Sequence, residues 1–230
     1  LTGEPIIDEY KFVDVIGTAT KSPIVTSNYL FNEIHAGGTL AAANMASNFV
    51  KNLIYLYPSS NKKTAVKNIN LNSNIKIFPF DINFKLPKKS RYITEVRKNK
   101  LFQNNLINKF TPNKKNYLKY LKKINLLKKK YPLMILDFGL GLFEKKIIKN
   151  NFNSSNLYLN VQSNSNNYGF NLFSKYKKYS YLSVNLREFE LNFKEKIYDL
   201  KEINTVSKKL TSLPVSITLG NKGSLFINKK

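Results

Sequence analysis

The feature that most restricts the fold is an alternation of short apolar segments with longer charged ones in the second half of the chain. Four apolar segments follow Pro132: LMILDFGLGL, NLYLNVQ, YSYLSVN and PVSITLG. Between them lie three segments of helical character: EKKIIKNNF, YGFNLFSKY and a charged stretch that opens with REFELNF. Strands that alternate with helices predict right-handed βαβ crossovers and a mostly parallel sheet. The sequence therefore predicts an α/β domain.

Polar residues or glycines stand at the carboxyl ends of these predicted strands. In open α/β sheets, ligands bind at that edge. We therefore expect the functional site to extend across the strand ends that carry Asp137, Asn160, Gln162, Asn185 and Gly220.

The first half of the chain is less regular. A helix is predicted over residues 39–57, where small residues predominate, and short strands and loops are predicted over 59–115. A surface helix is predicted over 113–132, because Tyr117, Leu121, Ile124 and Leu127 recur at helical spacing with lysines on the other face. With 230 residues and a hydrophobic fraction of 42%, residues 1–230 are expected to form a single domain.

The net charge of +24 raises the question of a nucleic-acid partner. Residues 1–50, however, carry two basic and five acidic side chains, and the excess downstream is spread among Asn, Ile, Tyr and Phe. This distribution favours lysines on tolerant, solvent-facing helix faces. A basic groove is not expected, and nucleic acid is not the expected partner.

Composition also excludes some classes of protein. The chain has no cysteine, which excludes a disulfide framework and a thiolate metal site. Apolar runs fall far short of the ~20 residues that a membrane helix needs, and the opening LTGEPIIDEY is too acidic for a secretory signal. A cytoplasmic location without membrane contact is expected. The missing initial methionine and the polar FINKK end suggest that both ends are cut.

One stretch lacks the lysines that fill the rest of the chain. EIHAGGTLAAANMASNFV, residues 33–50, holds the glycine pair Gly37 and Gly38 and, within a small-residue helix, Asn44. Paired glycines let backbone amides approach a hydroxylated ligand where any Cβ would collide. Close packing of the helix alone is the alternative explanation.

Two further motifs lie at predicted strand ends. Asn185-Leu-Arg-Glu188 places two oxygen-bearing side chains one turn apart, as a water-bridged magnesium–phosphate site requires, although an N-cap with its capping-box partner has the same pattern. Thr218-Leu-Gly220-Asn-Lys-Gly223 has the character of a glycine turn that admits a nucleotide phosphate or ribose, or else of a plain hairpin.

In this order the motifs resemble those of the ribokinase, or PfkB-type, family of carbohydrate kinases, over nearly the whole chain. GEPIIDEY is similar to the family's opening segment, and AGGTLAAANMA to its sugar-side glycine pair and asparagine. VNLREFE resembles its Asn-x-x-Glu motif and TLGNKGSLF its nucleotide segment. LDFGLGLF, NVQSNSNNYGFNLFSKY and SRYITEVRKNKLF look most similar to heptose-phosphate-kinase-like members, which often occur beside or fused to a nucleotidyltransferase.

The resemblance implies a ribokinase-like three-layer fold with a small β lid, whose strands are expected within 10–35 and 75–105. It also implies ATP and Mg²⁺ as cofactors, a sugar or sugar-phosphate substrate, and a homodimer through the lid. Of the residues it assigns, Asp8, Gly37, Gly38 and Asn44 would bind the sugar; Asn185 and Glu188 the phosphate and magnesium, Glu188 through water; and Thr218, Gly220 and Gly223 the nucleotide.

Some residues receive weaker assignments. Arg91 or Arg97, in the lid region, would reach a substrate phosphate, and Asn160 and Gln162 are further candidates at the site. His35 is expected to be structural or solvated, and no ligand contact is expected at Leu140. The family's Gly-Ala-Gly-Asp segment, which carries the catalytic base, is not found, so the base is expected beyond Lys230 and the fold is expected to be incomplete at the C-terminus.

The function that the sequence favours is ATP-dependent phosphorylation of a sugar or sugar phosphate. Residues 1–230 alone are expected to be inactive. Two alternatives stay open: a sugar-binding or regulatory domain without turnover, and a basic nucleic-acid-binding protein.

Overall fold

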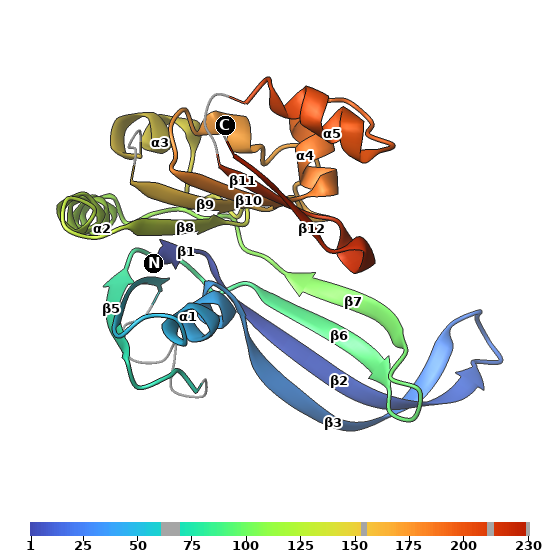
Figure 1. Ribbon diagram of the computed structural model, residues 1–230. Helices are drawn as coiled ribbons and strands as arrows, with labels where there is room; N and C mark the ends of the chain where they lie inside the picture. The colour runs from blue at the N-terminus through green and yellow to red at the C-terminus, as the bar shows by residue number, and fades with distance from the viewer. Residues whose placement is uncertain (61–69, 153–155, 211–213, 229–230) are drawn as a thin grey trace.

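The computed structural model describes residues 1–60, 70–152, 156–210 and 214–228. Among these, eight strands form the main sheet in the order β12-β11-β10-β9-β8-β1-β4-β5, in which all neighbours are parallel except β11 and β12 (Figure 1). The predicted α/β class with a mostly parallel central sheet is confirmed. The strands are β1 (Thr2–Gly3), β4 (Leu53–Ser59), β5 (Ile75–Asp81), β8 (Leu133–Asp137), β9 (Leu157–Val161), β10 (Tyr181–Asn185), β11 (Val215–Thr218) and β12 (Ser224–Ile227).

Helices cover the two faces of the main sheet unequally. Figure 1 shows α3, α4 and α5 on one side of the sheet and α1 on the other. The core on the α3 side joins alternate residues of β8 to β11 to apolar residues of the helices, as the alternating burial along these strands shows. The helices are α1 (Thr39–Ser47), α2 (Lys114–Leu127), α3 (Lys145–Asn151), α4 (Leu186–Phe193) and α5 (Leu200–Ser207), with the short 3₁₀ helices η1 (Phe173–Lys175) and η2 (Gly220–Lys222).

The opposite face of β8, β9 and β12 is partly open in the described residues. Met134, Tyr158 and Phe226 are 39%, 37% and 60% exposed. Parallel sheets are normally covered on both faces. This face of the sheet is therefore a surface on which apolar side chains meet solvent.

Two predicted helices are wrong in extent. The helix predicted over 39–57 ends at Ser47, and LIYLYPS forms β4, because it lies between β1 and β5, where Tyr55 and Tyr57 are fully buried. YGFNLFSKY contains only the single turn η1. Small-residue and aromatic segments carry a weak local preference, which tertiary contacts override here.

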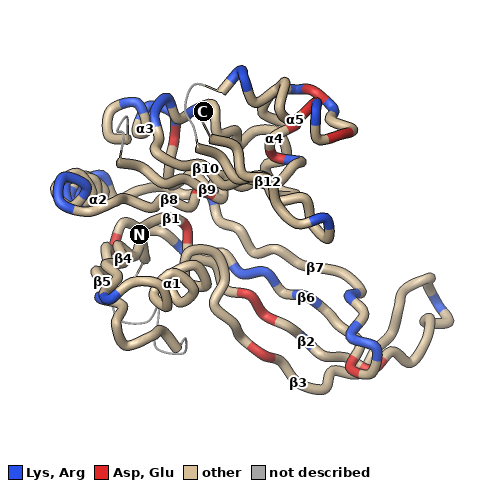
Figure 2. Tube along the Cα trace, in the orientation of Figure 1, with Lys and Arg blue, Asp and Glu red and all other residues tan. Residues whose placement is uncertain are grey.

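Lysines on α2 face solvent, as the helical spacing predicted. Tyr117, Leu121 and Ile124 are buried, whereas Lys119 and Lys122 are exposed. Figure 2 shows lysine and arginine distributed over α2, α3, the C-terminal helices and the strands of the second sheet. No helix of the described residues is long and apolar enough to cross a membrane.

A second sheet of four strands projects from the main one (Figure 1), in the order β3-β2-β6-β7. Its strands are β2 (Pro5–Thr18), β3 (Val25–Gly38), β6 (Lys88–Thr94) and β7 (Lys100–Leu106). The lid strands were expected within 10–35 and 75–105. In the structure, β2 and β3 extend beyond the first of these ranges, and β5, within the second, pairs with β4 in the main sheet. Because β2 starts two residues after β1, the first residues of β2 lie where the two sheets meet.

Candidate active site

Asp8 lies beside the glycine pair on neighbouring strands. β2 pairs antiparallel with β3, so that Asp8 is opposite His35 and Ile6 is opposite Gly37. A Cβ at Gly37 would lie 2.5 Å from Asp8 Oδ2. Gly38 adopts φ 56°, and a Cβ there would lie 2.5 Å from the carbonyl oxygen of Glu4. Both positions therefore exclude larger residues, because backbone and carboxylate come too close.

Arg91 of β6 reaches the same carboxylate. Its Nη1 is 2.7 Å from Asp8 Oδ1, and the two side chains are 18% and 21% exposed. The guanidinium also lies over the ring of Tyr10, 5.3 Å from its centroid. A partly exposed carboxylate with a paired guanidinium offers hydrogen-bond acceptors to hydroxyl groups and a cation to an anionic group. Arg97, by contrast, is in the exposed turn between β6 and β7.

Asn44 is engaged elsewhere. Its amide nitrogen donates to the carbonyl of Asn70, and its oxygen accepts the N–H of Asn72. These contacts fasten α1 to the segment before β5. The structure thus brings Asp8, Gly37 and Gly38 together, and it gives Asn44 a role in tying α1 to that segment.

His35 is exposed and bonds to Glu33, with Nε2 3.0 Å from Oε2. Its ring meets Tyr10 edge-on at 5.3 Å. In the register of β2 with β3, His35 is opposite Asp8.

Glu4, which the sequence reasoning passed over, is fully buried next to this site. Its carboxylate accepts the backbone N–H groups of Phe138, Leu140 and Leu142, at 2.5, 2.9 and 3.1 Å. Burial and the nearby Asp137 raise the pKa of Glu4 to about 8, against the opposing effect of these N–H groups. Glu4 therefore fixes the loop that follows β8, across more than 130 residues of sequence.

Asp137, at the carboxyl end of β8, is likewise a fully buried carboxylate. Its Oδ2 is 2.6 Å from Lys175 Nζ and accepts the Tyr176 hydroxyl at 2.7 Å, while Oδ1 accepts the N–H of Gly139. Burial, followed by the charge of Asp137, raises the pKa of Tyr176 well above its usual value. The strand-end position of Asp137 was predicted, but its partners were not.

Asn185 and Glu188 form a reciprocal capping box at the start of α4. The Asn185 side chain accepts the N–H of Glu188 at 2.8 Å, and Glu188 Oε2 accepts the N–H of Asn185 at 2.8 Å. Glu188 Oε1 also accepts the N–H of Ser163 beyond β9, at 3.0 Å. Burial raises the pKa of Glu188, although these hydrogen bonds act in the opposite direction. The alternative that the sequence left open, helix capping, is thus realised, and each carboxylate oxygen keeps a lone pair for a water molecule.

Thr218 is next to Asn185, because β10 and β11 pair with those two residues in register. After Thr218 the chain turns through η2 into β12. Gly220 and Gly223 have φ values of 65° and 89°, and a Cβ at either would meet open space. The turn is exposed, so a phosphate or ribose can approach its backbone without hindrance.

Asn160 and Gln162 bond to each other, with Gln162 Nε2 3.0 Å from Asn160 Oδ1. Asn160 also donates to the carbonyl of Ser183 on β10. Leu140 is buried and contributes its N–H to Glu4. The hydrogen bonds of these three residues thus go to neighbouring parts of the strand edge.

The described residues hold no group of three or more His, Asp or Glu side chains arranged to bind a metal directly. Mg²⁺ commonly retains its waters and takes one or two carboxylates together with substrate phosphates. Glu188 lies in the first turn of α4, and its carboxylate keeps free lone pairs, so it has the chemistry of such an indirect ligand.

The strand order and the two sheets are similar to the fold of solved ribokinase-like sugar kinases. Phosphofructokinase-2 of Escherichia coli, in complex with fructose-6-phosphate, superposes with a TM-score of 0.65 at 10% identity, over 100% of this chain and 76% of that chain. Ribokinase of Thermotoga maritima gives 0.58 at 17% identity, over 99% and 73%. A putative sugar kinase from Clostridium perfringens gives 0.56 at 13%, over 99% and 71%.

The similarity to these proteins is found in the fold and not in the amino-acid sequence. No protein-family model matches the chain, and no curated protein matches it either. The identities to the solved structures are low, so the likeness establishes the fold.

Proposed function

We propose that this chain is a sugar-kinase domain of the ribokinase family, which transfers the γ-phosphoryl group of ATP to a hydroxyl of a sugar or sugar phosphate. The observation that carries the proposal is the close approach of Asp8 to Gly37, where the two sheets of a fold similar to that of sugar kinases meet. A second observation supports the proposal: Asn185 and Thr218, from the two motifs at the ends of β10 and β11, are paired neighbours.

The sugar would bind through its hydroxyl groups. Asp8 accepts their hydrogen bonds, and Gly37 and Gly38 let the backbone approach the ring closely. Arg91 orients the Asp8 carboxylate and presents a cation to an anionic substituent. This cation favours a sugar phosphate over a neutral sugar, and a heptose phosphate is the substrate that the sequence motifs favour.

The nucleotide would lie along the turn after β11. Thr218 and the backbone of Gly220 and Gly223 would contact the phosphates or ribose, and Glu188 would hold magnesium through water. Magnesium supplies charge neutralisation on the phosphates, and the protein supplies position. Residues 1–230 contain no Gly-Ala-Gly-Asp segment, so the residues named here are assigned binding and positioning roles only.

A homodimer through the lid belongs to the same proposal. The lid sheet exposes apolar side chains such as Ile16, Tyr29 and Phe102, which are 63%, 60% and 58% exposed. One of the phosphofructokinase-2 structures is of a tetrameric inhibited form, so assembly occurs in that protein. An adjacent nucleotidyltransferase and a cytoplasmic location rest on sequence character alone.

Calorimetric titration tests the sugar site, with fructose 6-phosphate and a heptose phosphate as ligands. Asp8→Asn removes the carboxylate charge and should weaken binding by at least tenfold, since a hydrogen bond to a charged group is worth about 1.5–3 kcal/mol. Asp14→Asn is the matched control, because Asp14 is exposed on the same strand, away from the glycine pair. Equal effects of the two substitutions, or no binding of either sugar by the wild type, would reject the proposed site.

A second function, sugar binding without turnover, is the alternative that the sequence left open. Binding of a sugar phosphate with no transfer from ATP, in a form of the protein that includes any sequence beyond residue 230, would establish it in place of the kinase.

A further inference from the structure

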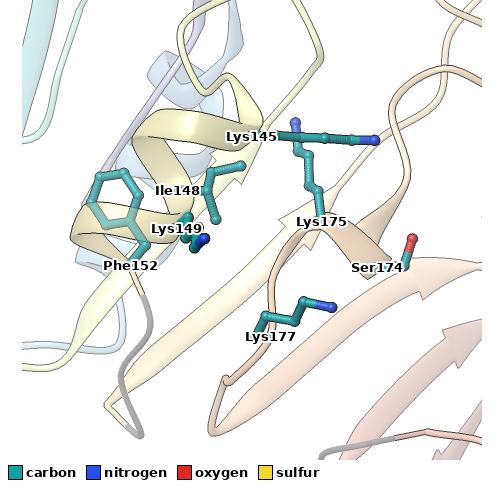
Figure 3. A pocket seen from close by; sticks show the side chains of 7 residues that line it. All are labelled: Lys145, Ile148, Lys149, Phe152, Ser174, Lys175 and Lys177. Atoms are coloured by element: carbon teal, nitrogen blue, oxygen red, sulfur yellow. The ribbon is translucent and has the colours of Figure 1, made fainter.

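A cavity of about 360 Å³ lies on the helical side of the main sheet, between α3 and the segment after β9 (Figure 3). None of the residues assigned above to the sugar or the nucleotide lines it. Cavities of this size are typical of small-molecule sites. One wall of the cavity comes from α3 and its C-cap residue, with Lys145, Ile148, Lys149 and Phe152. The other wall comes from the segment after β9, with Ser174, Lys175 and Lys177.

Four lysines line this cavity, but one of them is already neutralised. The Lys175 ammonium is 2.6 Å from Asp137 Oδ2 and also donates to Asn171 and to the carbonyl of Phe143. Lys145, Lys149 and Lys177 are exposed, and no hydrogen bond or ion pair joins them to any described residue. Three lysines without an acidic partner among the described residues therefore line one concavity.

The cavity also has an apolar floor. Ile148 and Phe152 are buried, with 2% and 0% exposure, and Phe152 packs edge-on against Phe143 at 5.5 Å. Neighbouring ammonium groups repel one another and attract an anion, whereas an apolar floor favours an uncharged ring or chain. The two features together select a ligand that has both parts.

We propose that this cavity binds a small organic phosphate. Its phosphate would contact Lys145, Lys149 and Lys177 and the Ser174 hydroxyl, and its apolar part would lie against Ile148 and Phe152. This site is additional to the kinase site. Lys175, which lines the cavity, also pairs through its ammonium group with Asp137 at the carboxyl end of β8.

The experiment must separate a built site from general attraction to a protein of charge +24. Phenyl phosphate and inorganic phosphate are titrated by calorimetry at fixed ionic strength into three proteins. These are the wild type, the double variant Lys149→Gln/Lys177→Gln, and the control Lys119→Gln/Lys122→Gln. The control removes the same two charges from exposed positions of α2 that do not line the cavity. All four lysines are exposed, so both variants should unfold at the wild-type temperature.

The expected result is that the cavity variant binds phenyl phosphate about tenfold more weakly or worse, because each lost charged hydrogen bond is worth at least that factor. The control should stay within about twofold of the wild type, and inorganic phosphate should bind the wild type more weakly than phenyl phosphate does. Equal weakening in both variants, unchanged binding by the cavity variant, or no binding by the wild type would overturn the proposal. Equal affinity for the two phosphates would overturn the apolar half of it.

Discussion

Gly37→Ala tests the sugar site most directly, because its effect can be calculated from one contact. The new Cβ would lie 2.5 Å from Asp8 Oδ2, 2.9 Å from Asp8 Cγ and 3.2 Å from the carbonyl oxygen of Ile6. Ordinary carbon–oxygen contacts are about 3.5 Å. The carboxylate must therefore move by about 1 Å, and this displacement breaks its 2.7 Å contact with Arg91.

The cost to folding should be small. Asp8 is partly exposed and can turn away, at about 0.5–1.5 kcal/mol for a strained rotamer, and a partly exposed ion pair contributes at most about 1 kcal/mol. We expect the free energy of unfolding to fall by about 1–2 kcal/mol. Sugar binding should suffer more, because a carboxylate displaced by about 1 Å loses charged hydrogen bonds of about 1.5–3 kcal/mol each, or tenfold or more in affinity.

A double-mutant cycle with Asp8→Ala provides the control. The shorter side chain leaves room for the Cβ, so Gly37→Ala should have little further effect on stability in that background. Urea denaturation measures the stabilities, and calorimetry with fructose 6-phosphate measures binding. If Gly37→Ala costs the same stability with and without the Asp8 carboxylate, the Cβ acts through another contact and the reasoning fails.

Four other outcomes are expected. Glu4→Gln should lower the free energy of unfolding near pH 5 by about 1–3 kcal/mol, since an amide cannot accept all three backbone N–H groups of the loop after β8. The pKa of Glu4 is raised from 4.5 to about 8, so the native state binds more protons between those values. Wild-type stability should therefore decline relative to Glu4→Gln as pH rises from about 4.5 to 8, by no more than ~1.4 kcal/mol per pH unit, and parallel denaturation curves across this range would contradict it. In any form of the protein that shows phosphoryl transfer, Glu188→Ala should lower kcat by about 10², which corresponds to roughly 2.7 kcal/mol, and should lower sugar affinity less. An unchanged kcat would leave Glu188 with helix capping only. Tyr29→Asp should weaken dimerisation by at least tenfold in light-scattering measurements, because an exposed apolar side chain of the lid becomes charged; a monomeric wild type would rule out the dimer.

Residues close together in sequence were the ones whose relations could be predicted. Asn185 and Glu188 are three residues apart at a strand–helix junction, and they form the capping box that their spacing indicates. Tyr117, Leu121 and Ile124 face the core because helical periodicity fixes which residues share a side. The βαβ alternation likewise placed β8 to β11, apart from the single turn η1 where a longer helix was predicted.

Contacts between distant segments could not be predicted in this way. Asn44 has the residue type expected near the glycine pair, but its side-chain amide forms hydrogen bonds with the backbone of Asn70 and Asn72. The only signal for Glu4 was an acidic residue between Gly3 and an apolar strand, and its burial depends on a loop that begins at Phe138. The extent of α1 depends on β4, which local preference assigned to the helix.

The sequence by itself determined the class of fold, the direction of the main strands and the edge at which polar groups gather, because these follow from periodicity and chain order. The tertiary structure decided which groups meet there. The register of β2 with β3 brings Asp8 to Gly37, and the pairing of β2 with β6 brings Arg91 to the same carboxylate. Such registers depend on the packing of whole sheets, in which a shift by one residue would turn each side chain to the other face.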